Sequence, residues 1–205
     1  VYNMSFDFRN RHYVSKRMNG TYEYSRISNK DAEERIVTYG NMKSFELLVN
    51  GKRMAIPKKN AENIKNSINS VNYFLLLPFG LNDVAVFKMY KGQTTIKTKV
   101  YDIIQVTFSE NGGGKDFEDV YFYWINSETF KVDYRACSYL VKGGGVRFRD
   151  AYNVRYVEGI SCVDYNNLKP KSKNVELQIL PELFVKGELD LLSKIETENI
   201  SLINE

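Results

Sequence analysis

The sequence predicts a mainly β (α+β) fold: a single curved antiparallel sheet forming a half-barrel, with an amphipathic helix packed on its concave face. Three observations predict it. Tyr and Phe, which favour half-buried strands, contribute 15 and 12 of the 205 residues. Short runs that alternate apolar and polar residues are separated by turn dipeptides such as Asn19-Gly20 and Asn50-Gly51. One segment, 58–77, has helical periodicity instead.

The alternating runs follow one another closely along the chain. Hairpins explain this spacing better than parallel units, because a parallel pair of strands needs a long crossover between its members. Further turns are predicted at Gly92 and at Glu158-Gly159. The predicted strands cover 2–8, 11–18, 21–27, 34–39, 43–50, 84–91, 94–101, 102–109, 119–126, 129–140, 146–158, 160–166, 174–180 and 193–203.

The helical segment carries its apolar residues on one stripe, at alternating intervals of three and four residues. The stripe consists of Ala61, Ile64, Ile68, Val71 and Leu75. Pro78 and Gly80 are expected to end the helix. The helix either covers an ordinary sheet core or plugs the concave side of a curved sheet, and both alternatives place the stripe against the sheet.

The hairpin 129–158 is predicted to have one aromatic and one basic face. The aromatic face comprises Phe130, Val132, Tyr134, Ala136, Val146, Phe148, Tyr152, Val154 and Tyr156, and the basic face includes Arg135, Arg147, Arg149 and Arg155. The register that keeps apolar residues opposite each other pairs Phe130 with Tyr156, Val132 with Val154, and Tyr134 with Tyr152, around a loop at 141–145. Asp150 interrupts the aromatic face, either as a solvated residue near the hairpin end or as a functional acid.

The residue types that most catalytic and metal sites require are scarce. His12 is the single His, and Cys137 and Cys162 are the only cysteines, so neither a zinc site nor a Ser-His-Asp triad is expected. The strand layout separates the two cysteines by more than a disulfide can span, which predicts free thiols. We therefore expect a protein that is not an enzyme, with no metal and no cofactor.

Charge and hydropathy constrain the partners. The net charge of +4 is mild and its lysines and arginines are scattered, which argues against a nucleic-acid partner. No apolar run is long enough for a transmembrane helix. We expect one domain over 1–205 with a truncated N-terminus, because Val1 is not an initiator Met and a strand pattern begins at once.

Several motifs resemble one family. They are GGGVRFRDAYNVR at 143–155, Gly159-Ile160, Asp164-Tyr165, YFLLLPFGL at 73–81, DVYFYWI at 119–125 and SKIE at 193–196. Together they resemble an uncharacterised family of Bacteroidetes envelope lipoproteins, similar in fold to the lipoprotein-carrier (LolA-like) half-barrels. The resemblance implies export, a lipidated Cys upstream that would provide the only membrane attachment, and a curved sheet enclosing helices. It implies no reaction.

The expected function is that of an envelope lipoprotein, in the periplasm or at the outer membrane, that binds a lipid, an acyl chain or another apolar ligand. The expected ligand-binding residues are Ile68, Val71, Leu75, Phe130, Val132, Tyr134, Tyr152, Val154 and Tyr156. One alternative is a structural or interaction module of the envelope with a filled core, which would dock another envelope protein. A hydrolase of lipids or glycans is a third, weaker alternative.

Overall fold

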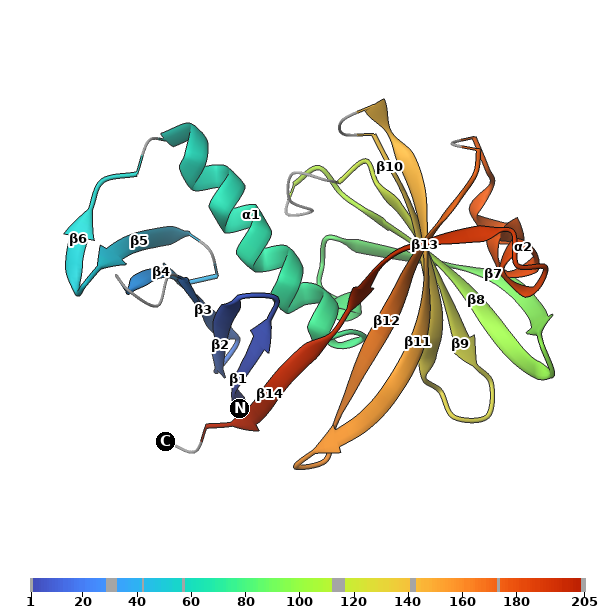
Figure 1. Cartoon of the computed structure of the whole chain (residues 1–205), viewed down its shortest axis with the longest axis horizontal. Helices are drawn as coiled ribbons and strands as arrows, with labels where there is room; N and C mark the ends of the chain where they lie inside the picture. Colours follow the sequence, from blue (N-terminus) through green and yellow to red (C-terminus); the bar gives the residue numbers. More distant parts are fainter. Residues whose placement is uncertain are drawn as a thin grey trace. The chain divides into compact units, whose positions relative to one another are not determined.

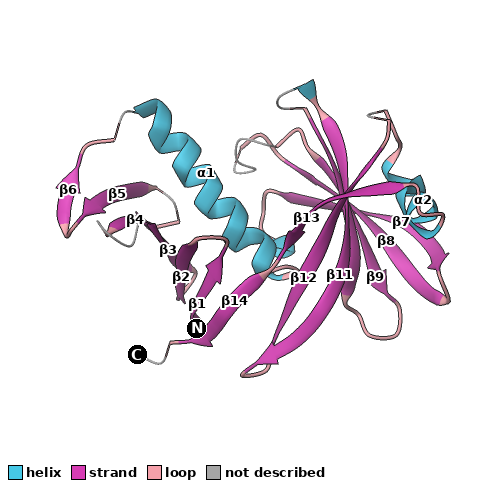
Figure 2. Ribbon diagram, viewed as in Figure 1, coloured by secondary structure: helices cyan, strands magenta, loops and turns pink. Residues whose placement is uncertain are grey.

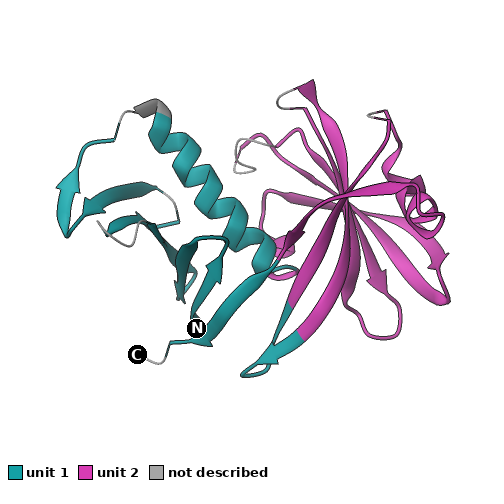
Figure 3. Cartoon of the chain, viewed as in Figure 1, with its two compact units in different colours: residues 1–77, 155–162, 196–205 teal, residues 78–154, 163–195 magenta. Residues whose placement is uncertain are grey.

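The computed structural model describes residues 2–28, 33–41, 43–56, 58–111, 117–140, 143–172 and 174–203. The described chain is mainly β, as predicted, and its strands pair antiparallel (Figure 2). The single sheet is wrong, because these residues form two sheets of seven strands each. The chain divides into two compact units: unit 1 comprises 1–77, 155–162 and 196–205, and unit 2 comprises 78–154 and 163–195 (Figure 3).

Unit 1 contains the first sheet (Figure 1). Its strands in spatial order are β14 (Thr197–Leu202), β1 (Tyr2–Phe8), β2 (Arg11–Met18), β3 (Thr21–Ser28), β4 (Glu34–Tyr39), β5 (Ser44–Val49) and β6 (Lys52–Met54). The turns Asn19-Gly20 and Asn50-Gly51 join consecutive strands as predicted, and all four residues have positive φ. Such paired left-handed conformations match the twist of two-residue hairpins, which is why Asn-Gly is favoured there.

Helix α1 (Lys58–Leu75) packs on strand β3 of the unit 1 sheet. Ile68 is fully buried against Tyr24 and Ile36. The helix was predicted to pack on the concave face of a single sheet, and these contacts place it on the sheet of unit 1 instead. Val71 and Leu75 pack in the neighbouring cluster around Met4, Phe6, Tyr13 and Cys162. The stripe itself is as predicted. Periodicity identifies the face that a helix buries but does not identify the sheet that receives it.

Unit 2 contains the second sheet. Its strands in spatial order are β13 (Leu189–Ile195), β12 (Ile160–Pro170), β11 (Gly145–Val157), β10 (Val132–Tyr139), β9 (Val120–Asn126), β8 (Lys99–Phe108) and β7 (Val86–Ile96). The residues at the tip of the β11–β12 hairpin, 155–162, belong to unit 1. Unit 2 also contains the short helical segments η1 (Phe79–Asn82), η3 (Leu177–Ile179) and α2 (Leu180–Val185).

The structure differs from the predicted strands at Gly92 and over 174–180. Gly92 has φ of +94° but lies inside β7, where the pairing with β8 shifts between Tyr90 and Gln93. This irregularity is a β-bulge. Glycines with positive φ occur in bulges as well as in turns, so the turn predicted at Gly92 is wrong. The segment 174–180, predicted as a strand, contains η3 and the start of α2 instead.

The register of the aromatic hairpin is displaced by two residues. Tyr134 lies opposite Asp150, instead of the predicted Tyr152, and Ala136 lies opposite Phe148. Phe130 explains the error, because it is not in a strand: its φ is +56° and its N–H donates to the carbonyl of Asn126 at 2.8 Å, within the turn before β10. A shift of two residues still leaves Tyr134 and Phe148 on one face, and both lie in the same buried cluster. Residues 141 and 142 of the predicted loop lie outside the described residues.

Both cysteines are free and buried, Cys137 in unit 2 and Cys162 in unit 1. We expect a disulfide-exchange reagent to titrate two thiols in the unfolded, unreduced protein. The native protein should react slowly, because burial raises the pKa of the Cys137 thiol and the thiolate is the reactive form. A count of zero in denaturant would show a disulfide and contradict the strand layout.

Candidate ligand-binding site

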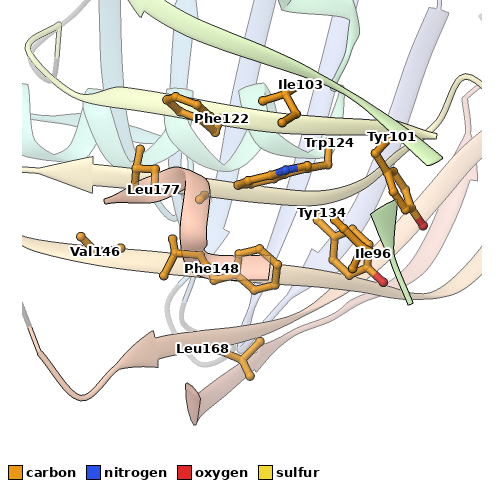
Figure 4. Close-up of a cluster of buried hydrophobic side chains, with 12 residues drawn as sticks. Ile96, Tyr101, Ile103, Phe122, Trp124, Tyr134, Val146, Phe148, Leu168 and Leu177 are labelled. Atoms are coloured by element: carbon orange, nitrogen blue, oxygen red, sulfur yellow. The ribbon is translucent and has the colours of Figure 1, made fainter. Parts of the chain in front are cut away.

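The inward face of the unit 2 sheet gathers a cluster of buried side chains that we name the aromatic interior (Figure 4). It comprises Ile96, Tyr101, Ile103, Phe122, Trp124, Tyr134, Ala136, Val146, Phe148, Leu168, Leu177 and Leu180. These residues come from six strands, β7 to β12, and from the η3–α2 segment. Six neighbouring strands of one sheet therefore contribute to a single buried cluster.

Aromatic rings occupy the centre of this cluster. The rings of Trp124 and Phe148 meet edge to face with centroids 5.7 Å apart, and Tyr134 stacks on Phe148 at 5.7 Å. Phe122 lies 6.1 Å from Trp124 along the same strand. Such spacings are typical of favourable aromatic pairs, each of which adds about 0.5–1.5 kcal/mol to the burial of its rings. The arrangement places an apolar aromatic surface at the centre of the cluster.

The short segment 177–185 covers this surface. Leu177 and Leu180 are buried in the cluster, while Leu183 and Phe184 are only half-buried against it. The Phe184 ring lies 5.4 Å from Phe148 and 5.7 Å from Tyr134. A helix of six residues has little intrinsic stability, so its position depends on these side-chain contacts.

Polar groups lie at one end of the aromatic interior. The cross-strand pairing places four side chains in one row across β8, β9, β10 and β11: Ile103, Trp124, Tyr134 and Asp150. Asn166 of β12 donates to Asp150 at 3.1 Å. The row therefore consists of one aliphatic side chain, two aromatic side chains that carry polar atoms, and a carboxyl group at one end.

A second carboxyl group lies beside this row. Tyr101 donates its hydroxyl hydrogen to Asp133 at 3.0 Å, and Asn126 donates to the same oxygen at 3.3 Å. Asp133 occupies an irregularity between Val132 and Tyr134 where the pairing with β9 shifts. Burial raises the pKa of the Tyr101 phenol, and the adjacent carboxylate raises it further, so Tyr101 acts as a hydrogen-bond donor at neutral pH.

The charge of Asp150 depends on this setting. Burial raises the pKa of its carboxyl group above the ordinary value of 3.8, whereas the hydrogen bond from Asn166 and the Lys97 ammonium oppose that shift. The carboxylate of Asp133 adds to the rise. Lys97 itself lies over the Phe184 ring, with its ammonium 4.8 Å from the ring centroid.

The raised pKa of Asp150 predicts a pH dependence of stability. Between 3.8 and the raised value, the native state holds a proton that the unfolded chain has lost, so the free energy of unfolding falls as the pH rises through this window. The Asp150→Asn variant should lose this part of the dependence, because an amide does not titrate in this range. Its oxygen can still accept the hydrogen bond from Asn166, so the local contact is kept. Urea unfolding of both proteins from acid to neutral pH measures it, and parallel profiles would contradict the prediction.

The structure does not bring the predicted ligand-binding residues together. Ile68, Val71 and Leu75 belong to the core of unit 1, and of the others only Tyr134 is part of the aromatic interior. Val132 and Tyr152 are half-buried. The other three predicted residues are exposed, with exposed fractions of 78% for Phe130, 60% for Tyr156 and 48% for Val154.

The residues missing from the prediction lie on neighbouring strands. Trp124 and Tyr101 were assigned to strands but not to the site, and Phe148, whose face was assigned correctly, lies at its centre. Phe184 follows Pro181 in a segment with no predicted element. The pattern Leu177, Leu180, Phe184, at intervals of three and four, is the signal that could have indicated a short helix there.

Within the described ranges, no group of three or more His, Cys, Asp or Glu side chains is placed to hold a metal ion. In the same part of the chain, no helix has the length and the apolar character needed to cross a membrane.

Comparison with known proteins gives a family but no function. No curated protein matches the chain. The model of a family described as "Family of unknown function (DUF6503)" matches residues 1–197, which is nearly the whole sequence. The chain therefore belongs to the DUF6503 family.

Proposed function

We propose that unit 2 is a non-enzymatic binding module for an apolar ligand, which it holds against the aromatic interior. The observation that supports this proposal most is the cover: an aromatic surface at the centre of a curved sheet is closed by a six-residue helix whose Phe184 is only half-buried. A ligand that displaces Phe184 would exchange one set of apolar contacts for another. Apolar sites with a few convergent polar groups are typical of small-ligand binding.

The cellular setting is part of the proposal. The resemblance to envelope lipoproteins suggests that the module works in the periplasm or at the outer membrane, attached through an upstream lipid anchor. Acyl chains and other membrane components are the apolar molecules available there, which agrees with an aromatic binding surface. The proposed ligand therefore comes from the membrane.

Trp124 provides a direct test, because it is the only Trp of the chain and lies in the aromatic interior. An uncharged alkyl ester that carries a nitroxide group should quench its fluorescence, since quenching by the nitroxide requires close approach. We expect saturable quenching at micromolar concentration, with a rise of the melting temperature because the ligand binds only the folded state.

Two variants of α2 sharpen this test. Phe184→Ala should increase the affinity several-fold, because the truncated side chain leaves its apolar space to the ligand. Val185→Ala is the matched control, since Val185 is 54% exposed on the same helix and its truncation should change nothing. If the unmodified protein fails to bind while Phe184→Ala binds, the aromatic interior is an ordinary filled core and the proposal is wrong.

A structural or interaction module is the second candidate, and strand β7 favours it. This strand is at one edge of the unit 2 sheet and exposes Phe87 at 57%, Met89 at 58% and Tyr90 at 59%. An exposed sheet edge can pair with a strand of another protein, and apolar side chains beside it would add contact area. Met89→Lys should abolish such pairing in a cross-linking assay in envelope extracts and leave the quenching of Trp124 unchanged.

A further inference from the structure

We infer that the polar group of the ligand is uncharged and both accepts and donates a hydrogen bond, as an alcohol or an amide does. This inference rests on the proposed function and specifies the chemistry of the ligand at the same site. It depends on one buried donor, Trp124, and on the carboxyl groups at the end of its row, Asp150 and Asp133.

The buried donor is the indole N–H of Trp124. The residue is fully buried, and among the described residues no acceptor lies within hydrogen-bonding distance of its Nε1 atom. Buried indole N–H groups usually have a partner, and leaving a buried donor unsatisfied is unfavourable because its bond to water has been lost. A ligand in the aromatic interior that presents an oxygen to this atom would remove that cost. Trp124 thus selects for an acceptor.

The position of Trp124 agrees with this role. It lies directly opposite Ile103 on one side and Tyr134 on the other, so it occupies the middle of the sheet and not an edge. Its ring contacts Phe148, which in turn contacts the half-buried Phe184 of the cover. A ligand entering beneath α2 would therefore meet Phe148 and Tyr134 first and reach the Trp124 ring next to them.

The acceptors determine what else the polar group needs. Tyr134, next to Trp124 in the row, lies directly opposite Asp150, and Asp133 lies beside the same row. A carboxylate has about four acceptor sites, and Asn166 provides one donor to Asp150, which leaves capacity for a donor from the ligand. A ligand hydroxyl or amide N–H fits this requirement, whereas an ester oxygen does not.

The same carboxyl groups select against an acid. Asp133 and Asp150 provide two negative charges when ionised, and Lys97 is the positive group that acts on Asp150. A third carboxylate placed among them would meet like charge in a partly desolvated setting, which is unfavourable. We therefore expect discrimination between a fatty acid and its amide although their apolar chains are identical.

The experiment uses four ligands that share one alkyl chain: the amide, the alcohol, the methyl ester and the carboxylate. Their affinities for the full-length protein are measured by calorimetry near neutral pH. We expect the amide and the alcohol to bind best, the ester about two- to tenfold more weakly for the loss of one hydrogen bond, and the carboxylate weakest. Asp150→Asn should strengthen carboxylate binding and reduce the discrimination.

The Trp124→Phe variant isolates the donor while keeping an aromatic ring in place. Its affinity for the amide should fall about two- to tenfold, and its affinity for a plain alkane of the same length should not change. A melting curve without ligand confirms that the variant is folded. Equal affinities for all four ligands, or a Trp124→Phe variant that binds the amide normally, would overturn this inference; failure of the unmodified protein to bind any of them would instead overturn the proposed function.

Discussion

Replacing Phe148 with Ala is expected to lower the free energy of unfolding of unit 2 by about 3–5 kcal/mol. Phe148 is fully buried at the centre of the aromatic interior, where its ring contacts Trp124, Tyr134 and Phe184. Truncation removes these contacts and leaves a cavity that the surrounding strands cannot close, because each is held by its neighbours in the sheet. Urea unfolding followed by Trp124 fluorescence measures the loss.

Val154→Ala is the control for this variant. Val154 is in the same strand but 48% exposed, so its truncation should change the unfolding free energy by less than about 0.5 kcal/mol. A Phe148→Ala variant as stable as the unmodified protein would mean that Phe148 lies beside empty or ligand-filled space instead of packed side chains. Addition of the alkyl amide would then distinguish the two, since a bound ligand raises stability by mass action.

Replacing Ile68 with Ala is expected to cost about 2–5 kcal/mol, in unit 1. Ile68 lies on the face of α1 that packs on the sheet, and it is fully buried against Tyr24 and Ile36. The loss should appear in far-UV circular dichroism, to which α1 contributes together with the other elements of both units. Trp124 lies in unit 2, so its fluorescence reports the other unit, and comparison of the two signals shows whether both units unfold in one transition.

Ser67→Ala provides the neighbouring control on the exposed face of α1. Ala is the better helix former, so this variant should be as stable as the unmodified protein or slightly more stable. Should Ile68→Ala be equally stable, α1 would not be anchored through its apolar stripe. The packing of the helix on β3 would then be wrong.

The sequence was sufficient to predict the hairpins and the helix, because turns and helical faces depend on residues that are close to each other in sequence. Alternation and Asn-Gly turns predicted the hairpins of unit 1, and the three- and four-residue spacing predicted α1. The break between the two sheets was not predictable by the same means. Strands β6 and β7, on either side of α1, belong to different sheets, and no feature within a strand states which other strand will be its neighbour.

The candidate site was predicted less well, since it depends on contacts between distant segments. The shared face of Tyr134 and Phe148 could be assigned, because alternation determines faces within a regular strand. The register of the hairpin could not, because Phe130 has the composition of a strand residue but lies in a turn with positive φ. The cover was missed because its apolar contacts, from Leu177 and Phe184 to Phe148, join segments about thirty residues apart in sequence.

The pairing of β1 with β14 has a consequence for folding. Met4 lies opposite Leu202 and Phe8 opposite Thr197, so this strand pair joins segments that are far apart in sequence. Until the pair forms, one side of β1 exposes unpaired backbone groups. Contacts of such long sequence separation form slowly. A chaperone that shields the unpaired strand during this interval would reduce aggregation.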